Sequence, residues 1–294
     1  MKVLAQLLVN GLIAGSMYAL AAIGYAMVYS ILKFANFANG SVAMVGAYLT
    51  FVLCTRLGIN VVLAFVLSML ISAFLGVVID KVAYKPLRQA PKISVLITAL
   101  ALSFILDASV LLIMGAEFKR FPFPIVKGLR LGMVFITPVQ VICIATSLFF
   151  MLSLHFLLTR TRIGKIIRAV ADNPELAAIN GLNTDNVISI VFAIGSALAA
   201  AAGTLIGMDS VISPAMGFVI TIKGFAACVL GGMGSINGAI LGSLIMGMVE
   251  NLGTWFLAGG DARWKTTFAY IVLMLILLIK PAGIFGRKGE ARVF

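Results

Sequence analysis

The sequence has few of the residue types on which soluble enzymes depend. Only 11% of its 294 residues are charged, and it contains three cysteines and a single histidine. Soluble domains carry about 25% charged residues. His155, Cys54, Cys143 and Cys228 all lie in apolar runs, at spacings that match no metal motif. We therefore expect no metal site and no histidine-based catalytic triad, and we interpret the cysteines as small core residues.

The chain also lacks the Walker A sequence G-x-x-x-x-G-K-[ST], so it is not expected to hydrolyse ATP itself. Proline is scarce, with eight residues, and no low-complexity linker divides the sequence. No acid, base, metal ligand and nucleophile cluster in it, which argues against a membrane enzyme. The sequence predicts a single domain over residues 1–294 that is not an enzyme and binds no cofactor.

What the sequence does have is long apolar runs. It is 62% hydrophobic, with a mean hydropathy of +1.14. A helix of about 20 apolar residues crosses a bilayer, so we predict an all-α, multi-pass membrane protein with eight or nine transmembrane helices. The first apolar run is far longer than a signal-peptide core of about 7–15 residues, and we interpret it as a retained span. The predicted segments are 4–32, 38–55, 61–79, 95–114, 138–158, 187–207, 218–230, 239–252 and 267–279. The alternatives differ in whether 218–230 crosses the membrane or is a re-entrant half-helix.

Basic residues in the connecting loops predict the orientation, because Lys and Arg concentrate on the cytoplasmic side. The 80–92 and 159–186 loops are both basic and are separated by two predicted spans, so both are placed in the cytoplasm. The N-terminus and the 115–137 loop then lie outside, and residues 129–135 of that loop alternate like a short strand. Nine crossings would put the basic tail, with Arg287, Lys288 and Arg292, inside. The net charge of +12 is attributed to such loops and not to nucleic-acid binding, since no basic–aromatic motif accompanies it.

A polar stretch, 168–183, interrupts the apolar runs. Asn173 is a favourable N-cap, and Pro174 fits the first helical position. Glu175 places a negative charge at the positive end of the helix dipole, and Gly181 can end the helix in the left-handed conformation. These residues predict a helix of about two turns, roughly 10 Å long, which needs packing to be stable. We interpret it as a cytoplasmic docking helix that a soluble partner binds.

Glycines and amides mark further candidate sites. Gly11 and Gly15, and Gly238, Gly242 and Gly247, have the spacing of close helix packing. The run Gly231-Gly-Met-Gly-Ser235 breaks any helix, and it is either a tight turn or part of a lined path. The segment from Asn36 to Gly40 opens the second span. It either caps a helix or forms a broken helix along a translocation path.

Asp107 and Glu250 are carboxylates inside predicted spans. An isolated charge there costs at least about 2.5 kcal/mol, so each should face the bundle interior. A buried structural hydrogen bond is the favoured interpretation, and an ion- or proton-coupled role is the alternative. That role would make the chain a stand-alone secondary transporter or channel for a small polar solute or amino acid.

Several motifs, in order along nearly the whole chain, resemble those of LivH-type permeases of high-affinity branched-chain amino acid ABC transporters. They are Gly15-Ser-Met-Tyr-Ala-Leu20, Asn36-Phe-Ala-Asn-Gly40, Lys85-Pro-Leu-Arg88, Arg168-Ala-Val-Ala-Asp172 and Val229-Leu-Gly-Gly-Met-Gly-Ser235. The 175–181 stretch is also close to the E-A-A-x-x-x-G pattern of importer coupling loops, with Leu176 in place of the first Ala. The family usually has His at the position of Asn39.

The resemblance implies an ABC-importer permease fold in the bacterial inner membrane, with the cytoplasmic coupling loop at about 159–186. It implies a LivM-like second permease, two cytoplasmic ATPases that use ATP, a periplasmic amino-acid-binding protein and surrounding membrane lipid. Branched-chain amino acids are the implied substrates, although relatives also carry other amino acids, amides or urea. The implied ATPase-coupling residues are Arg168, Asp172, Asn173, Pro174, Glu175, Ala177, Ala178 and Gly181. The residues assigned to the translocation path or gate are Asn36, Phe37, Asn39, Gly40, Gly231, Gly232, Gly234 and Ser235.

Overall fold

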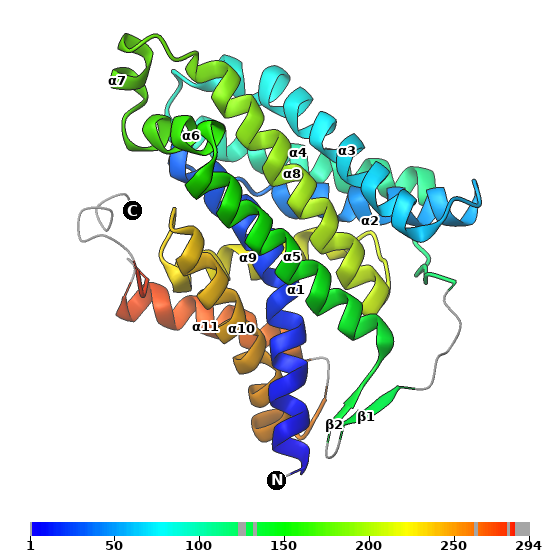
Figure 1. Cartoon of the computed structure of the whole chain (residues 1–294). Coiled ribbons are helices and arrows are strands. Elements are labelled where there is room, and N and C mark those ends of the chain that lie inside the picture. Colours follow the sequence, from blue (N-terminus) through cyan, green and yellow to red (C-terminus); the bar gives the residue numbers. More distant parts are fainter. Residues whose placement is uncertain (1, 123–127, 132–133, 262–263, 281–282, 286–294) are drawn as a thin grey trace.

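The computed structural model describes residues 2–122, 128–131, 134–261, 264–280 and 283–285, most of which are helical (Figure 1). The apolar helices are α1 (Lys2–Leu32), α2 (Asn39–Thr55), α3 (Val61–Ile79), α4 (Lys92–Met114), α5 (Pro138–Arg160), α8 (Thr184–Asp209), α9 (Met216–Gly231), α10 (Ile236–Ala258) and α11 (Lys265–Ile279). Two further helices, α6 (Arg162–Asp172) and α7 (Pro174–Ile179), and two strands, β1 (Leu129–Leu131) and β2 (Val134–Ile136), lie between them. Short π- and 3-10 turns, η1 (Asp80–Tyr84) and η2 (Lys85–Leu87), continue α3. The all-α fold predicted from the sequence is confirmed, and every predicted span is a helix.

The apolar helices differ in length. Six of the described helices are long and apolar enough to cross a membrane. The other three, α2, α9 and α11, have 17, 16 and 15 residues. They are therefore roughly 23–26 Å long, somewhat shorter than the hydrocarbon core of about 30 Å.

The bundle has two distinct ends (Figure 1). At one end, the N-terminus of α1 meets the β1–β2 hairpin, where the Gln6 side chain hydrogen-bonds the backbone N–H and C=O of Phe135. Lys119 and Ile212 pair their backbones at the same end. The other end carries α6 and α7. This separation agrees with the predicted placement of the 115–137 and 159–186 loops on opposite sides of the membrane.

Helix α9 connects these two ends. It follows Ile212, which is paired at the hairpin end. After α9, Gly234 and Ser235 lie beside α6 at the other end. A re-entrant half-helix would return to the end from which it came, so the path of α9 favours nine crossings over eight.

Residues 129–135 do not form the single strand that their alternation predicts. Leu129 pairs with Ile136 and Leu131 with Val134, which makes an antiparallel hairpin of two three-residue strands. A lone strand outside the helical bundle would leave its backbone groups without partners, and folding back satisfies them.

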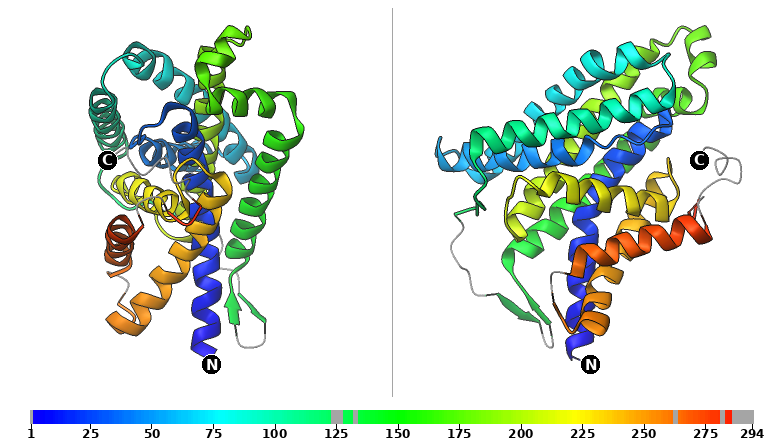
Figure 2. Two further views of the ribbon diagram at one scale, coloured as in Figure 1. Left: turned by 90° about the vertical axis from the view of Figure 1, so that its left-hand side faces the viewer. Right: turned by 180° about the vertical axis from the view of Figure 1, so that it is seen from behind.

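Helix α1 runs through the middle of the bundle, with α5 on one side and α9 and α10 on the other (Figure 2). Small residues bring α1 and α10 close together. A Cβ added to Gly11 would lie 2.8 Å from Met248 Cα, and one added to Gly15 would lie 2.8 Å from Leu244 Cα. These contacts confirm the interpretation of the glycines as helix-packing residues. Cys143 and Cys228 are buried core residues as expected, and Cys54 is partly exposed.

The connection from α1 to α2 turns back into the bundle. The side-chain amide of Asn39, the first residue of α2, donates to the Ala21 carbonyl. Ala21 lies about three turns, or roughly 16 Å, before the end of α1 at Leu32. Residues 33–38 therefore descend beside α1 without helical structure. Such backbone is tolerated at membrane depth only where protein groups satisfy it.

Ion pairs tie the α3–α4 connection to α8 at the α6–α7 end. Arg88 bridges Asp80, at 2.7 Å, and Asp185 in the first turn of α8. Lys85 pairs with Asp185 at 2.8 Å, and the Ser189 hydroxyl donates to Asp80 at 2.6 Å. The predicted basic tail with Arg287, Lys288 and Arg292 lies outside the described residues.

Candidate functional site at the α6–α7 end

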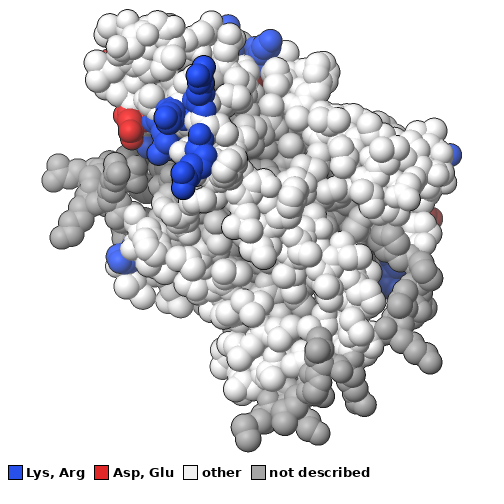
Figure 3. Space-filling view, in the orientation of Figure 1, with Lys and Arg blue, Asp and Glu red and all other residues white. Residues whose placement is uncertain are grey.

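Helix α6 folds back sharply from the end of α5. Thr161 is extended, and its hydroxyl accepts a hydrogen bond from the Gly164 N–H, which caps α6. Gly164, Ile167 and Val170 are buried at helical spacing, so one face of α6 packs inward. The exposed basic side chains of this region form a patch over α6 in the space-filling view (Figure 3). They are Arg160, Arg162, Lys165 and Arg168.

Helix α7 has the local structure that its sequence predicts. The Asn173 side-chain oxygen accepts from the backbone N–H groups of Glu175 and Leu176, each at 3.0 Å. Pro174 is the first helical residue, and Gly181 has a φ of +80°, with open space around it. The predicted cap, first turn and terminating glycine are all confirmed, and the helix ends at Ile179, two residues before Gly181.

The outer surface of α7 is apolar. Leu176 is 56% exposed and Ile179 is 80% exposed, three residues apart on a helix that projects from the bundle (Figure 1). Ala177, by contrast, is buried. Two large apolar side chains on a capped, projecting helix suit a pocket on another protein. The sequence motif pointed to Ala177 and Ala178 and missed these two residues, although a leucine and an isoleucine in a polar loop were a visible signal.

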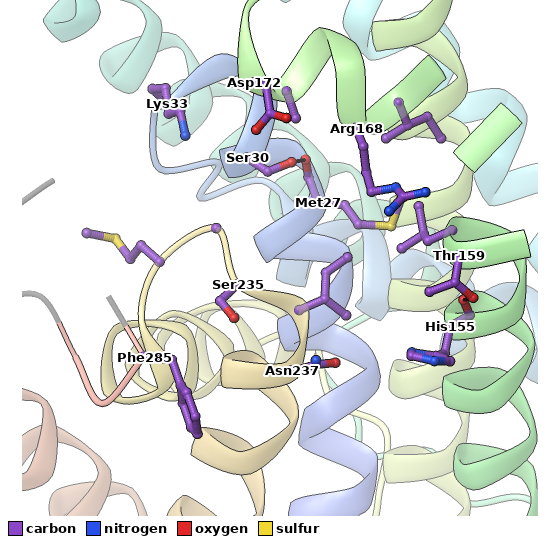
Figure 4. A pocket seen from close by; sticks show the side chains of 16 residues that line it. Met27, Ser30, Lys33, His155, Thr159, Arg168, Asp172, Ser235, Asn237 and Phe285 are labelled. Atoms are coloured by element: carbon purple, nitrogen blue, oxygen red, sulfur yellow. Dashed lines mark hydrogen bonds between the residues drawn. The ribbon is translucent and has the colours of Figure 1, made fainter. Parts of the chain in front are cut away.

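A cavity of about 510 Å³ lies beneath α6. Its walls come from α1, α5, α6, the α9–α10 turn and the start of α10. Figure 4 shows Arg168 and Asp172 reaching into it from α6, with Ser235 and Asn237 on the opposite side and Ser30 of α1 between them. His155, the single histidine, lines the α5 wall.

This cavity brings together parts of the two sets of predicted site residues. Arg168 and Asp172 belong to the predicted coupling set, and Gly234 and Ser235 belong to the predicted gate. Gly232 and Gly234 have φ values of +105° and +84°, which only glycine adopts easily. The glycine run is thus a tight turn between α9 and α10, and it also forms one wall of the cavity under α6.

The other predicted path residues do not line this cavity. Asn36 is buried and accepts a hydrogen bond from the Tyr84 hydroxyl at 2.7 Å. The ring of Phe37 packs 5.7 Å from that of Phe225 on α9. Gly40 is pressed against the backbone of Gly217 and the side chain of Thr221. The segment therefore anchors the start of α2 to α9, deeper in the bundle.

One oxygen of Asp107 lacks the buried structural hydrogen bond that its sequence position predicts. This oxygen, Oδ1, has no hydrogen-bond partner among the described residues. The same oxygen lies 2.9 Å from the position that a Cβ on Gly217 would occupy, at the start of α9. The positive end of a helix dipole stabilises a carboxylate without a basic partner, which gives Asp107 a physical explanation.

Glu250 does have a partner, as predicted. Lys223 of α9 donates to Glu250 Oε1 at 2.7 Å, and both side chains are buried. The sequence-based reasoning did not single out Lys223. The available signal was a lysine in the middle of an apolar segment, which is rare without a function.

The comparisons with known proteins agree with this architecture. Residues 7–278 match the family described as branched-chain amino acid transport system / permease component. The chain belongs to this family. It is 38% identical to the high-affinity branched-chain amino acid transport system permease protein BraD of Pseudomonas aeruginosa, over 98% of this chain and 97% of that protein. The identity to LivH of Escherichia coli is also 38%, over the same shares of the two chains.

A solved structure shares the fold of this branched-chain permease family member. The structure titled PsaBC from Streptococcus pneumoniae in complex with Fab has a TM-score of 0.51, at 13% sequence identity. The match covers 94% of this chain and 92% of that one. The chain is accordingly a multi-pass protein of the bacterial inner membrane and a non-catalytic component of a transport system.

Proposed function

We propose that this chain is a membrane-spanning subunit of an ATP-driven importer that passes branched-chain amino acids into the cytoplasm. A LivM-like permease completes the pathway, two cytoplasmic ATPases supply the energy, and a periplasmic binding protein delivers the substrate. The family and the names of the relatives support the substrate class.

The observation that carries this proposal is the surface of α7. The helix is capped at both ends by its own sequence, and its buried Ala177 packs it against the chain, so it keeps its shape where it projects from the bundle. Leu176 and Ile179 are exposed on it, at a distance from the apolar bundle surface. A secondary transporter has no evident use for a projecting apolar helix, whereas an ABC permease needs a docking element through which its ATPase can move it.

The connections of α7 make it a suitable lever. Through α6 it continues α5, and through the turn at Gly181 it continues α8. Arg88 and Lys85 join the first turn of α8 to the end of α3. A displacement of α7 would therefore reach α3, α5 and α8 together. The cavity beneath α6 gives the α9–α10 turn room to move relative to that unit.

The opposite end is suited to the binding protein. The β1–β2 hairpin and the Ser210–Ala215 connection both lie there, and the Lys119–Ile212 backbone pairing joins the two loops. A protein that docks on this end would contact the segments leading into α5 and α9. Substrate delivery and ATP-driven motion would thus act on opposite ends of the same helices.

The test is the double variant Leu176→Ala with Ile179→Ala, in the complete transporter reconstituted with its binding protein. We expect the permeases to assemble, and the ATPases to be lost on purification or to hydrolyse ATP without transport. Leucine uptake should fall at least about tenfold, because truncating an interface hot spot costs about 1.4 kcal/mol or more of binding free energy.

The matched control is Val62→Ala with Leu63→Ala. These residues are 72% and 57% exposed on α3, at the other end of the bundle, so they test the loss of exposed apolar area alone. Uptake should be unchanged in the control. Normal uptake by the α7 variant would show that α7 is not the docking element.

A further inference from the structure

Three helices meet at a buried cluster of charged and polar groups. Lys223 Nζ of α9 donates to Glu250 Oε1 of α10 at 2.7 Å and to the Tyr18 hydroxyl of α1 at 2.9 Å. The ammonium also lies 4.9 Å from the centroid of the Tyr18 ring. The side chains of Lys223 and Glu250 are only 8% and 2% exposed, and Tyr18 is the partly exposed member.

The cluster lies at mid-span. Lys223 is near the middle of α9, and Tyr18 is near the middle of α1. In the interiors of the described apolar helices, charges of both signs come together only here, because Asp107 has no basic partner. Burying two charges costs several kcal/mol each, which their attraction only partly offsets. Ionisable residues at this depth therefore indicate a functional site by default.

The hydrogen bonding of the cluster is incomplete. Glu250 Oε2 is buried and has no partner among the described residues. An ammonium has three donors, and the two contacts to Tyr18 and Glu250 use two of those of Lys223. One acceptor and one donor thus remain side by side. A complementary ligand would present a donor and an acceptor that are a few ångströms apart.

We propose that this cluster recognises the zwitterionic main chain of the amino acid as it crosses the membrane. The substrate ammonium binds the free oxygen of Glu250, and its carboxylate binds Lys223. In this structure the two side chains neutralise each other, and the two charged groups of the substrate would take the place of that pairing. The partly exposed Tyr18 marks the side from which the substrate enters. The start of α2, which lies deep in the bundle beside α9, fits this role. Transporter sites lie near the bilayer midplane beside discontinuous helices. This inference rests on the proposed function.

The experiment is photo-crosslinking during turnover. The complete transporter is reconstituted with its binding protein and supplied with photo-leucine, a leucine with a diazirine side chain and both main-chain charges intact. After illumination in the presence of ATP, labelled peptides are identified by mass spectrometry. We expect ATP-dependent labelling of α1, α9 and α10 around Tyr18, Lys223 and Glu250.

Two double variants separate recognition from a structural role. The neutral pair, Lys223→Met with Glu250→Gln, should assemble but should no longer be labelled at this cluster. Its leucine uptake should fall at least about tenfold, since each lost hydrogen bond to a charged group lowers affinity by a factor of ten or more. The exchanged pair, Lys223→Glu with Glu250→Lys, restores an ion pair but presents the charges in reverse order. Recognition predicts that the exchanged pair assembles and still fails to transport, and Asp107→Asn serves as the control that keeps the label.

Several results would overturn the inference. One is labelling of the unchanged transporter at other helices only. Another is that the neutral pair keeps both the label and leucine uptake, which would mean that the cluster holds only a structural water. Wild-type uptake by the exchanged pair would show that the ion pair is purely structural. Absence of ATP-dependent uptake of leucine, isoleucine and valine by the unchanged complex would instead overturn the proposed function itself.

Discussion

Asp80 and Glu250 are both buried carboxylates with a basic partner, yet their surroundings differ. Asp80 is 0% exposed and has both oxygens bonded, one by Arg88 at 2.7 Å and the other by Ser189 at 2.6 Å. Glu250 is 2% exposed, but only Oε1 has a partner. Buried polar groups are normally satisfied, so an orphan oxygen needs an explanation. The fully bonded Asp80 holds helices together, whereas Glu250, with one oxygen free, is able to exchange its partner.

Asp80 and Glu250 also differ in where their ion pairs lie in the bundle. Arg88 and Asp185 are partly exposed at the α6–α7 end, where water reaches the ion pairs. The Lys223–Glu250 pair lies inside the bundle, where a change of charge cannot be relieved by water. Substitutions that remove one partner from each pair should therefore separate the two kinds of site.

The largest effect on stability is expected from Arg88→Ala. It leaves the fully buried Asp80 without its cation, which costs about 3–5 kcal/mol. The free energy of unfolding, measured in mixed micelles, should fall by that amount. Lys85→Ala is the control, because Lys85 is 52% exposed and its pair with Asp185 should contribute less than about 1 kcal/mol. Equal losses in the two variants would contradict the structural role given to Arg88.

An effect nearly as large is expected from Lys223→Met or Glu250→Gln alone. Each leaves one buried charge uncompensated, at a cost of about 3–5 kcal/mol. The double variant removes both charges, and it should therefore be more stable than the sum of the two single losses predicts. A double-mutant cycle in micelles measures this coupling, and strict additivity would mean that the pair does not interact.

The smallest effect is expected from a neutral cluster used as a baseline. The Thr50 hydroxyl lies 2.7 Å from that of Ser68 and 3.0 Å from that of Thr204, which joins α2, α3 and α8. Hydrogen bonds of this kind between membrane helices contribute about 0.6 kcal/mol on average. Thr50→Val should cost about that much in the same unfolding measurement. A loss as large as that of Arg88→Ala would show that charge is not what distinguishes the clusters.

Local features could be predicted from the sequence because they depend on residues close together in the chain. The structure of α7 depends on Asn173, Pro174 and Gly181, each acting on its immediate neighbours. The apolar helices likewise follow from composition alone. The helix break at Gly231–Ser235 was also predictable, because a glycine run breaks a helix in any context.

Other features depend on residues far apart and could not be predicted from sequence pattern. The partner of Glu250 lies on another helix, and that of Asn36 is Tyr84, beyond α3. The alternation over residues 129–135 predicts one strand and not the β1–β2 hairpin, because alternation alone does not show where a chain folds back. The cavity beneath α6 exists only because the fold places α6 and the α9–α10 turn on opposite sides of it. The roles of the coupling and path residues remain predictions from the sequence and its family.

The most direct test of the proposed importer is to purify the epitope-tagged chain from its native membrane under mild detergent and identify the proteins that accompany it by mass spectrometry. We expect a second permease and two ATPase subunits, with the ATPases lost from the Leu176→Ala, Ile179→Ala variant. A chain that purifies alone even after crosslinking, and that transports by itself with an ion gradient, would contradict it.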